Sequence, residues 1–240
     1  MKPSQLQMEY YSKTAAEYDV AHLENDVDED GCNEHTFALH FFSAMIEQYN
    51  ITRILDVGAG TGRAIKYLMV NHPNLEIMGI EPVKELREQG YNKGISDKIL
   101  IEGDGCHIEF PDQSFDLVCE FGVLHHVPKP ELMVAEMLRV AKNMIFISDC
   151  NNFGQGSSLV RFFKQALNQL GLWKAYDFLR TKGRGYQISE GDGLFYSYSV
   201  FNNFNQIKNA CRRIHLLNTH NTSRNFYKSA THLALFGVKK

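Results

Sequence analysis

Hydrophobic positions along the chain follow two alternating patterns. Short runs of β-branched and aliphatic residues predict strands at 53–57, 74–80, 98–102, the first half of 110–127, 144–149, 213–219 and 230–238. Apolar positions three or four residues apart predict helices at 4–22, 34–49, from 64 onward, 129–141, 159–170, 174–180 and 200–211. The alternation predicts an α/β fold built on a doubly wound, mostly parallel sheet with helices on both faces.

Three glycines at alternate positions, Gly58, Gly60 and Gly62, follow the first predicted strand and lead into a helix. In an open parallel sheet such a turn lies at the carboxyl edge, where a nucleotide-like ligand can lie against the backbone. Glycine keeps side chains away from the ligand and permits positive φ. A dinucleotide fingerprint would need a further glycine at position 63, where the chain has Arg63. The alternative is a tight strand-to-helix turn with no ligand.

Two motifs resemble those of the class I S-adenosylmethionine-dependent methyltransferases. Asp56 and the three glycines match motif I of that family, D-x-G-x-G-x-G, in full. Residues 115–127 are similar to the family's F-D-x-V-x-x-x-x-x-L-H-H-V signature. The resemblance spans nearly the whole chain except 150–199, and it implies a Rossmann-like, seven-stranded sheet with an antiparallel last strand. One departure is Ala141-Lys142-Asn143, which we expect to form a turn where the family has Pro-Gly-Gly.

The N-terminal segment 10–19 looks like the leading helix of small-molecule methyltransferases, with the pattern Y-Y-x-x-x-A-x-x-Y-D. In that family the helix closes over the cofactor. Tyr11, Ala15 and Tyr18 fall on one helical face. A tyrosine lid over a sulfonium has a physical motive, because aromatic faces attract cations. The alternative is an amphipathic helix that packs its tyrosines on the sheet.

The resemblance also implies how the methyl donor is held. Glu81 lies 21 positions after Gly60, where an acid at the tip of the second strand accepts hydrogen bonds from both ribose hydroxyls. Asp104, after the third strand, would accept from the adenine amine. The alternatives are an acid that stabilises a helix N-terminus and a simple Asp-Gly turn. The S-adenosylmethionine contacts implied in this way are Tyr11, Tyr18, Asp56, Gly58, Ala59, Gly60, Gly62, Glu81, Pro82, Asp104, Gly105, Cys106, Glu120 and Phe121.

Methyl transfer from a sulfonium is an in-line displacement, so the protein mainly has to align donor and acceptor and exclude water. A hydroxyl or ammonium acceptor also needs a base to remove a proton. His125 and His126 follow the fourth strand and Asp149 ends the fifth, so these three are the candidate bases, with His125 preferred. The alternative is that a histidine only packs the following turn. Tyr196 and Tyr198 are expected to form acceptor walls, and no metal ion is expected.

These assignments divide the chain into three regions. We expect N-terminal helices and the donor-binding core at 1–149, an insertion that caps the acceptor site at 150–199, and the rest of the core at 200–240. The insertion contains six Lys or Arg residues and three acids. This excess of positive charge is typical of a solvated basic face, and an anionic or carboxylated acceptor is the alternative that it also suggests.

Amino-acid composition and charge restrict the binding partners and the cellular compartment that we expect for this protein. A net charge of −3 gives no electrostatic reason to expect nucleic acid or an anionic membrane as a partner. Five scattered cysteines without a C-x-x-C pair, no signal core and no apolar run of membrane-spanning length favour the cytoplasm. The acidic stretch 24–31 is expected to be a solvated loop.

Together these observations predict an S-adenosylmethionine-dependent methyltransferase that modifies a small molecule, with a hydroxyl acceptor preferred. An RNA or protein methyltransferase is the nearest alternative, and its usual marks are a basic stripe or an added binding module, which the sequence does not show. Residues 120–123 also lack the Asn/Asp-Pro-Pro-aromatic run that this superfamily uses to methylate amino groups of nucleic acid bases. From other classes, a nicotinamide-binding oxidoreductase and a non-catalytic cofactor-binding protein remain open.

Overall fold

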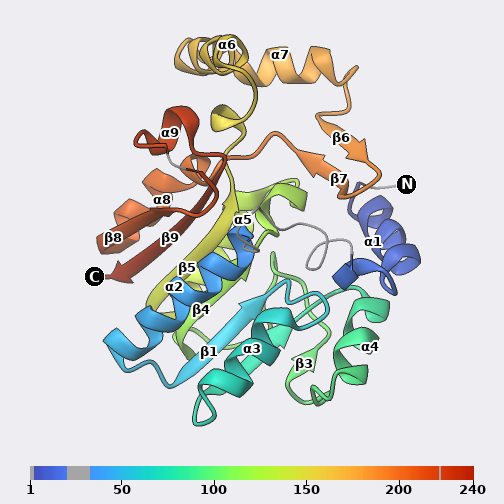
Figure 1. The fold of residues 1–240 in the computed structure, drawn as a ribbon, viewed down its shortest axis with the longest axis vertical. Helices are drawn as coiled ribbons and strands as arrows, with labels where there is room; N and C mark the ends of the chain where they lie inside the picture. The colour runs from blue at the N-terminus through green and yellow to red at the C-terminus, as the bar shows by residue number, and fades with distance from the viewer. Residues whose placement is uncertain (1–2, 21–32, 222) are drawn as a thin grey trace.

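A seven-stranded sheet forms the centre of the molecule (Figure 1). The computed structural model describes residues 3–20, 33–221 and 223–240, so the acidic stretch 24–31 and Cys32 lie outside the described residues. The strands of this sheet are β1 (Arg53–Val57), β2 (Glu76–Ile80), β3 (Leu100–Ile101), β4 (Phe115–Phe121), β5 (Ala141–Cys150), β8 (Cys211–Asn218) and β9 (His232–Lys239). Their order is β3-β2-β1-β4-β5-β9-β8. The first five in this order are parallel, and β9 runs antiparallel to both neighbours, which confirms the predicted sheet.

Helices cover both faces of the sheet, because successive side chains of a strand point to opposite faces. The helices are α1 (Pro3–Thr14), α2 (Glu34–Tyr49), α3 (Arg63–Asn71), α4 (Lys84–Asn92), α5 (Pro130–Val140), α6 (Ser158–Gln169), α7 (Trp173–Arg180), α8 (Phe204–Ala210) and α9 (Phe226–Ser229). On one face, α2 and α3 pack with Ile54 and Phe146. On the other, α5 and α8 pack with Leu55 and Ile147. Neighbouring strand residues thus belong to two separate cores.

The N-terminal segment is a shorter helix than its spacing predicts. α1 ends at Thr14, a turn follows, and a second short helical stretch begins at Tyr18. The Thr14 hydroxyl donates to the Tyr10 carbonyl at 3.1 Å, a local bond that competes with the regular helix. Tyr11, Ala15 and Tyr18 nevertheless meet in one cluster against the start of α4. The predicted shared face is therefore present although the single helix to residue 22 is not.

The segment 141–143 is the beginning of β5 and not the expected turn. Ala141 pairs with Phe115 of β4, with an irregularity before the next pair. Because the segment contains neither Pro nor Gly, its backbone can extend and pair directly. Helix α5 therefore passes into β5 without an intervening loop.

The insertion between β5 and the 3₁₀ turn η4 (Val200–Asn202) has two structural parts. Helices α6 and α7 form the far end of the molecule, and the hairpin of β6 (Tyr186–Ser189) and β7 (Gly193–Tyr196) lies beside α1 (Figure 1). The Trp173 indole donates to the Ser197 hydroxyl at 2.9 Å, which connects α7 to the end of the hairpin.

The cysteines of the described ranges are free thiols, and they are Cys106, Cys119, Cys150 and Cys211. Cys119 and Cys211 are buried in the core. Across the part of the chain that the structure describes, none of the helices combines the length and the apolar character needed to cross a bilayer.

Candidate active site

The glycine turn joins β1 to α3 at the carboxyl edge of the sheet. Gly58 has a φ of +75°, and a Cβ atom there would lie 2.6 Å from a methyl carbon of Val123. Both the positive φ and the close approach require glycine. The N–H groups of Gly58 and Ala59 donate to the Ile80 carbonyl at 2.9 and 3.0 Å, which ties the turn to the end of β2. A Cβ atom at Gly60 would meet no described atom within 4 Å, so the backbone is accessible there.

Glu81 lies directly after β2 and is almost fully buried. One carboxylate oxygen accepts the Gly60 N–H and the other accepts the Val83 N–H, both at 2.9 Å. Burial raises the pKa of Glu81 to about 7, although the two N–H donors favour its charged form. Each carboxylate oxygen has a further lone pair, so this anchored group can still accept from a diol. The ribose role stays a prediction, and the geometry is compatible with it.

A small cavity lies between the glycine turn and the segment after α1. Its lining residues are Tyr18, Asp56, Gly58, Ala59, Gly60, Thr61, Arg63, Ala64 and Phe121. Burial raises the pKa of Asp56 to about 7, with the Arg63 cation acting in the opposite direction. Burial likewise raises the pKa of Tyr18 to about 12. Six of the predicted donor contacts therefore surround one space, together with a cation, Arg63, that was not among them.

Asp19 attaches the N-terminal segment to the glycine turn. Its Oδ1 atom accepts the Thr61 hydroxyl at 2.6 Å, and its second oxygen forms an ion pair with Lys93 after α4. Nearby, the Ser12 hydroxyl donates to Glu85 at 2.7 Å and attaches α1 to α4. These contacts hold the segment beside the small cavity, and the closing role that the family resemblance implies for it stays a prediction.

His125 and Asp149 meet where β4 and β5 end. His125 lies in the 3₁₀ turn η2 (Leu124–His126), and its Nδ1 atom is 2.8 Å from Asp149 Oδ1. Its Nε2 atom is 3.4 Å from a carboxylate oxygen of Asp192 in the β6–β7 turn. Burial opposes a charged ring, but the two carboxylates raise the pKa of His125 well above its usual range. Burial also opposes ionisation of Asp149, yet the neighbouring imidazolium lowers the pKa of that carboxyl group. Both neighbouring carboxylates therefore favour the protonated form of His125.

His126 connects the same place to α1 and to β7. Its Nδ1 atom lies 2.6 Å from the Leu194 carbonyl oxygen, so this nitrogen carries the proton. Its Nε2 atom then accepts the Tyr11 hydroxyl at 2.9 Å. Burial and the charge on its neighbour lower the pKa of His126, which favours this neutral form. Gln7 accepts the Leu194 N–H and donates to the Asp192 carbonyl at 3.2 Å, which holds α1 against the hairpin. The Tyr11 hydroxyl is bonded to Nε2 of His126 at 2.9 Å, whereas Nε2 of His125 has only a longer, 3.4 Å contact with Asp192, so the geometry favours His125 as the base.

The predicted adenine contacts lie after β3. Asp104 is exposed, and its Oδ1 atom accepts the Cys106 N–H at 2.8 Å, which is the local turn named above as the alternative. A Cβ atom at Gly105 would lie 2.8 Å from Val57, so core packing is enough to require glycine there. Pro82 is exposed beside the buried Glu81. The turn leaves lone pairs on Asp104 for an amine, and the donor roles of these residues stay predictions.

Two residues near the site are buried in structural contacts. The Glu120 carboxyl group accepts the N–H groups of Val123 and Ser148 at 2.8 and 3.0 Å. Burial and the nearby Asp149 charge raise the pKa of Glu120 well above its usual range. Tyr198 is 2 % exposed and donates to the Asn203 side chain at 3.0 Å. The expectation that Tyr198 forms an acceptor wall is therefore wrong, because its ring and hydroxyl belong to the core.

Some of these side chains lie close enough to share a metal ion. Ligand atoms of His125, His126 and Asp192 lie within 4.8 Å of one another, as do those of His125, Asp149 and Cys150. Imidazole, carboxylate and thiolate groups are ligands for zinc and similar metals. In the structure these groups also bond to each other, as the His125–Asp149 and His125–Asp192 contacts show. The expectation of a metal-free site stays a prediction.

Sequence reasoning missed Asp192, Gln7, Asp19 and Arg63 as members of the site. Asp192 is 67 residues beyond His125 and reaches it only because the β6–β7 hairpin folds back over the sheet. Asp192 lies in a short acidic turn with glycines, and an ordinary surface loop has the same composition. Asp19 did carry a signal, because it is the last residue of the N-terminal motif that resembles the leading helix of methyltransferases.

Comparison with known proteins agrees with this geometry. Residues 55–144 match the family model described as "Methyltransferase domain". The chain is 29 % identical over 131 residues to a phosphatidylethanolamine N-methyltransferase of Cereibacter sphaeroides, covering 48 % of this chain and 58 % of the relative. It is 29 % identical over 96 residues to the 27-O-demethylrifamycin SV methyltransferase of Amycolatopsis mediterranei, covering 38 % of this chain and 35 % of the relative.

Among solved structures, the magnesium protoporphyrin IX methyltransferase of Synechocystis PCC 6803 with bound S-adenosylhomocysteine has a TM-score of 0.60 at 11 % identity, covering 100 % of both chains. At this identity the likeness concerns the fold. The chain spans less than two thirds of the length of the two curated relatives. Residues 55–144 therefore resemble a methyltransferase domain, and the seven-stranded sheet with its antiparallel strand β9 has the same fold as the methyltransferase structure with bound S-adenosylhomocysteine.

Proposed function

We propose that the protein transfers a methyl group from S-adenosylmethionine to a hydroxyl oxygen of a small molecule. The observation that carries this proposal is the His125–Asp149 pair, 2.8 Å apart, at the strand ends next to the glycine turn. Such a pair supplies what a hydroxyl acceptor needs and an already basic acceptor does not, namely a positioned base. The Asp149 carboxylate holds the Nδ1 side of the ring and leaves Nε2 facing the hairpin.

The residues around the glycine turn fit the proposed donor. Glu81 is held by two backbone N–H groups with lone pairs to spare for a diol, and the Gly60 backbone is accessible. Arg63 lines the same cavity and would bind the carboxylate of the methionine part. Tyr18 adds an aromatic face to the cavity, where a sulfonium is favoured.

In the proposed reaction the bound donor supplies a methyl group that is already activated by positive charge. The protein then has three tasks, which are to align the acceptor, to exclude water and to accept a proton. Neutral His125 takes the hydroxyl proton at Nε2, while Asp149 stabilises the imidazolium that forms. Asp192, from the hairpin, lies against the same Nε2 atom, so the acceptor hydroxyl takes the place of this contact. Gln7 and His126 keep the hairpin and α1 together over the reacting groups.

The names of similar proteins cover nitrogen, oxygen and carbon acceptors, as in phosphatidylethanolamine N-methyltransferase, 27-O-demethylrifamycin SV methyltransferase and sterol 24-C-methyltransferase. The base geometry is the reason to prefer oxygen for this chain. Basic residues in the insertion favour an acceptor with an anionic or carboxylated group. We also propose a cytoplasmic location, because the four described cysteines are free thiols and a reducing compartment keeps them so.

Donor binding is tested by calorimetry with S-adenosylhomocysteine and NADH as separate titrants. We expect binding of S-adenosylhomocysteine only, and binding of NADH alone would favour the oxidoreductase alternative. Glu81→Gln should weaken binding by about tenfold to a hundredfold, because a hydrogen bond to a charged group contributes roughly 1.5–3 kcal/mol. Glu88→Gln, at an exposed position of α4, is the matched control. Equal affinity of both variants would remove Glu81 from the ribose.

The acceptor is tested with a methyl-labelled donor and pools of small molecules that carry hydroxyl, amino or activated carbon groups. We expect label in methyl ethers. Label only in N- or C-methyl products would contradict the oxygen acceptor and leave donor binding intact. Label only in RNA or protein would contradict the small-molecule acceptor, and no label in any pool would favour a cofactor-binding protein without catalysis.

A further inference from the structure

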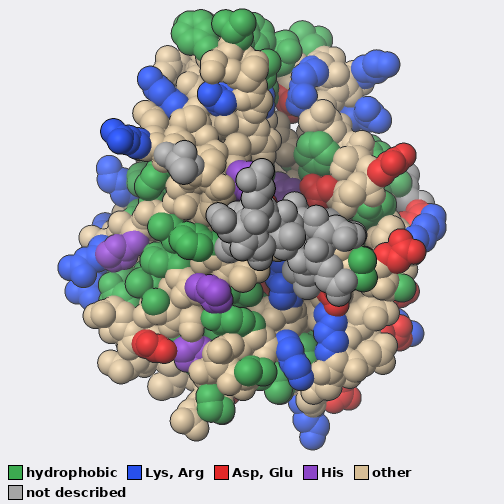
Figure 2. Space-filling model, viewed as in Figure 1, with side chains coloured by type: hydrophobic (Ala, Val, Ile, Leu, Met, Phe, Trp, Pro, Cys, Tyr) green, Lys and Arg blue, Asp and Glu red, His purple; other side chains and the backbone are tan. Residues whose placement is uncertain are grey.

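The outer end of the insertion exposes large hydrophobic side chains. We call this surface the apolar tip, and its residues are Leu159, Phe162, Leu170, Leu172, Phe178 and Leu179. Leu159 is 82 % exposed and Leu179 is 76 % exposed, so these side chains point into solvent and not into a core. Figure 2 shows hydrophobic side chains gathered at this end of the molecule, where Figure 1 has α6 and α7. Single exposed leucines are ordinary, but a gathered set of this size marks an interaction site.

Positive charge surrounds the apolar tip. Residues 158–184 contain six basic residues, which are Arg161, Lys164, Lys174, Arg180, Lys182 and Arg184. The one acid of this segment, Asp177, is buried and paired with Arg180. The segment therefore carries a net charge of +5 in a chain whose net charge is −3. Figure 2 shows Lys and Arg side chains directly below the hydrophobic end.

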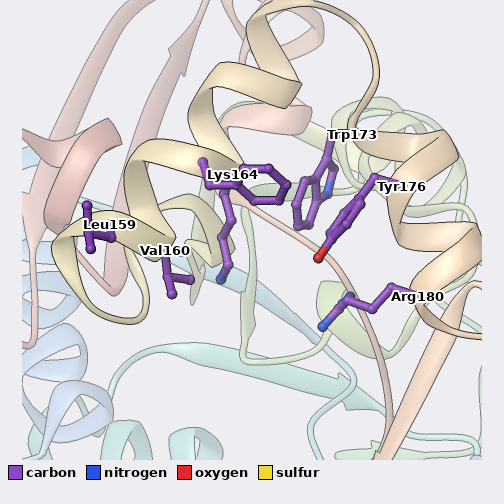
Figure 3. A pocket seen from close by; sticks show the side chains of 7 residues that line it. Leu159, Val160, Lys164, Trp173, Tyr176 and Arg180 are labelled. Carbon is purple, nitrogen blue, oxygen red and sulfur yellow. The ribbon is translucent and has the colours of Figure 1, made fainter.

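A cavity of about 320 Å³ lies between α6 and α7 at the base of the tip. Its walls include Phe163, Trp173 and Tyr176, and two cations, Lys164 and Arg180, reach into its open side (Figure 3). The Lys164 ammonium donates to the Asn152 carbonyl at 2.8 Å and to its side-chain oxygen at 2.9 Å, which holds it in place. Apolar walls with two fixed cations suit a molecule that has an anionic group next to a hydrocarbon part.

We propose that the α6–α7 tip docks on the surface of an anionic lipid bilayer. The exposed Leu and Phe side chains enter the boundary between headgroups and acyl chains, and the surrounding Lys and Arg side chains bind lipid phosphates. An amphipathic surface of this composition binds through its apolar area and through attraction to anionic lipids together. The inference goes beyond methyl transfer and does not depend on the acceptor.

Charge argues against a second copy of the chain as the occupant of the tip. A symmetric dimer brings the same patch of each copy together, so six cations would face six cations without any exposed acid from 158–184 between them. An anionic bilayer has the complementary charge and also accepts the apolar side chains. The bilayer is therefore the occupant that satisfies both properties of the surface.

The test is flotation of the full chain with vesicles of phosphatidylcholine alone or mixed with phosphatidylglycerol. We expect binding to the mixed vesicles that weakens as salt rises. Leu159→Ser with Leu179→Ser, and separately Lys174→Glu with Lys182→Glu, should each reduce binding on the order of tenfold or more. Matched controls are Val70→Ser on α3, 69 % exposed, and Lys208→Glu on α8, also exposed. All substituted positions are exposed, so thermal unfolding should be unchanged.

A second readout uses Trp173, the only tryptophan of the chain, which lines the cavity below the tip. Lipids with brominated acyl chains should quench its fluorescence in the wild type and much less in the two double variants. Failure to float on anionic vesicles, or equal flotation of the tip variants and the controls, would overturn the proposal. A dimer seen by light scattering that Leu159→Ser with Leu179→Ser abolishes would assign the tip to a second copy instead.

Discussion

At the scale of single residues, the proposed mechanism makes activity depend on the proton of His125. The ring lies between Asp149 and Asp192, and their charges raise the pKa of His125 although burial opposes it. Its favourable contribution to stability is complete below the unfolded-state pKa of about 6.5 and is lost as pH rises through the raised folded-state value. The same rise in pH produces the neutral ring that a base requires, so turnover should increase toward alkaline pH.

Asp192→Asn should shift this pH dependence. Removal of one of the two carboxylates lowers the pKa of His125, so the midpoint of the kcat–pH curve should move to lower pH while S-adenosylhomocysteine affinity stays unchanged. Glu190→Gln, in the same turn with an exposed side chain, is the control. His125→Gln should lose most of kcat and the alkaline rise together. A midpoint that does not move in Asp192→Asn would show that this carboxylate does not act on the histidine.

The sequence predicted the candidate site residues that follow strands. It did not predict the residues of the insertion that contact them. Asp56, Glu81, His125 and Asp149 all lie at or near the carboxyl ends of parallel strands, where spacing along the chain predicts position in space. Asp192 reaches the site through a long-range hairpin contact, and no local pattern encodes such a contact. Tyr198 was assigned to the acceptor from its neighbourhood in the sequence, whereas its side chain points into the core.

At the scale of elements, α1 and the residues after it form a closure that is attached at a few polar contacts. Asp19 bonds to Thr61 in the glycine turn and pairs with Lys93, and Gln7 bonds to the hairpin. Few apolar residues support the segment, since its cluster consists of Ala15 with the start of α4 and two tyrosines. Elements held in this way open at low cost in free energy, which a donor needs in order to enter.

Asp19→Asn should weaken this closure. The change removes an ion pair and alters a hydrogen bond of 2.6 Å, so donor affinity should fall by about fivefold to tenfold, equivalent to roughly 1–1.4 kcal/mol. The measurement is calorimetric titration with S-adenosylhomocysteine, with Glu17→Gln at an exposed position as the control. If Asp19→Asn binds as tightly as Glu17→Gln, the contact with Thr61 does not close the site.

Element boundaries were predictable where the hydrophobic period was strong, as in α2, whose bounds agree with the prediction. They were wrong where a local contact competes with the period, as at Thr14, where the helix ends early. The segment 141–143 shows the reverse case, because a turn was inferred from family spacing and the residues themselves favour an extended strand.

At the scale of the whole molecule, the core of the central sheet packs directly against the small cavity beside the glycine turn. Phe146 on β5 is fully buried, with its ring centroid 4.7 Å from that of Phe42 on α2 and 5.3 Å from that of Phe121. Phe121 also lines the small cavity beside the glycine turn. The wall of the proposed donor site is therefore continuous with the core between the sheet and α2.

Phe146→Ala should lower the free energy of unfolding by about 3–5 kcal/mol, the usual cost of removing a buried phenylalanine ring. Urea denaturation measures this change, and Val70→Ala, at a position 69 % exposed on α3, should change it little. A loss below that of an exposed substitution would mean that the core relaxes around the vacated space.

The strands and most helices of the core could be predicted because they carry their own local signals, whereas the antiparallel last strand was implied by the family resemblance and no range was predicted for α4. The arrangement of the insertion could not be predicted, because α6 and α7 leave several large apolar side chains in solvent, contrary to the rule that such patterns mark a core. A helical period identifies the apolar side of a helix but not what covers it.

One continuous stretch, from Asn151 to Ser199, holds both Asp192 at the catalytic end and the leucines at the opposite end. The residues proposed to bind the methyl donor lie before this stretch, within residues 1–149. This one segment therefore links the proposed proton-accepting site to the proposed lipid-docking surface at its far end.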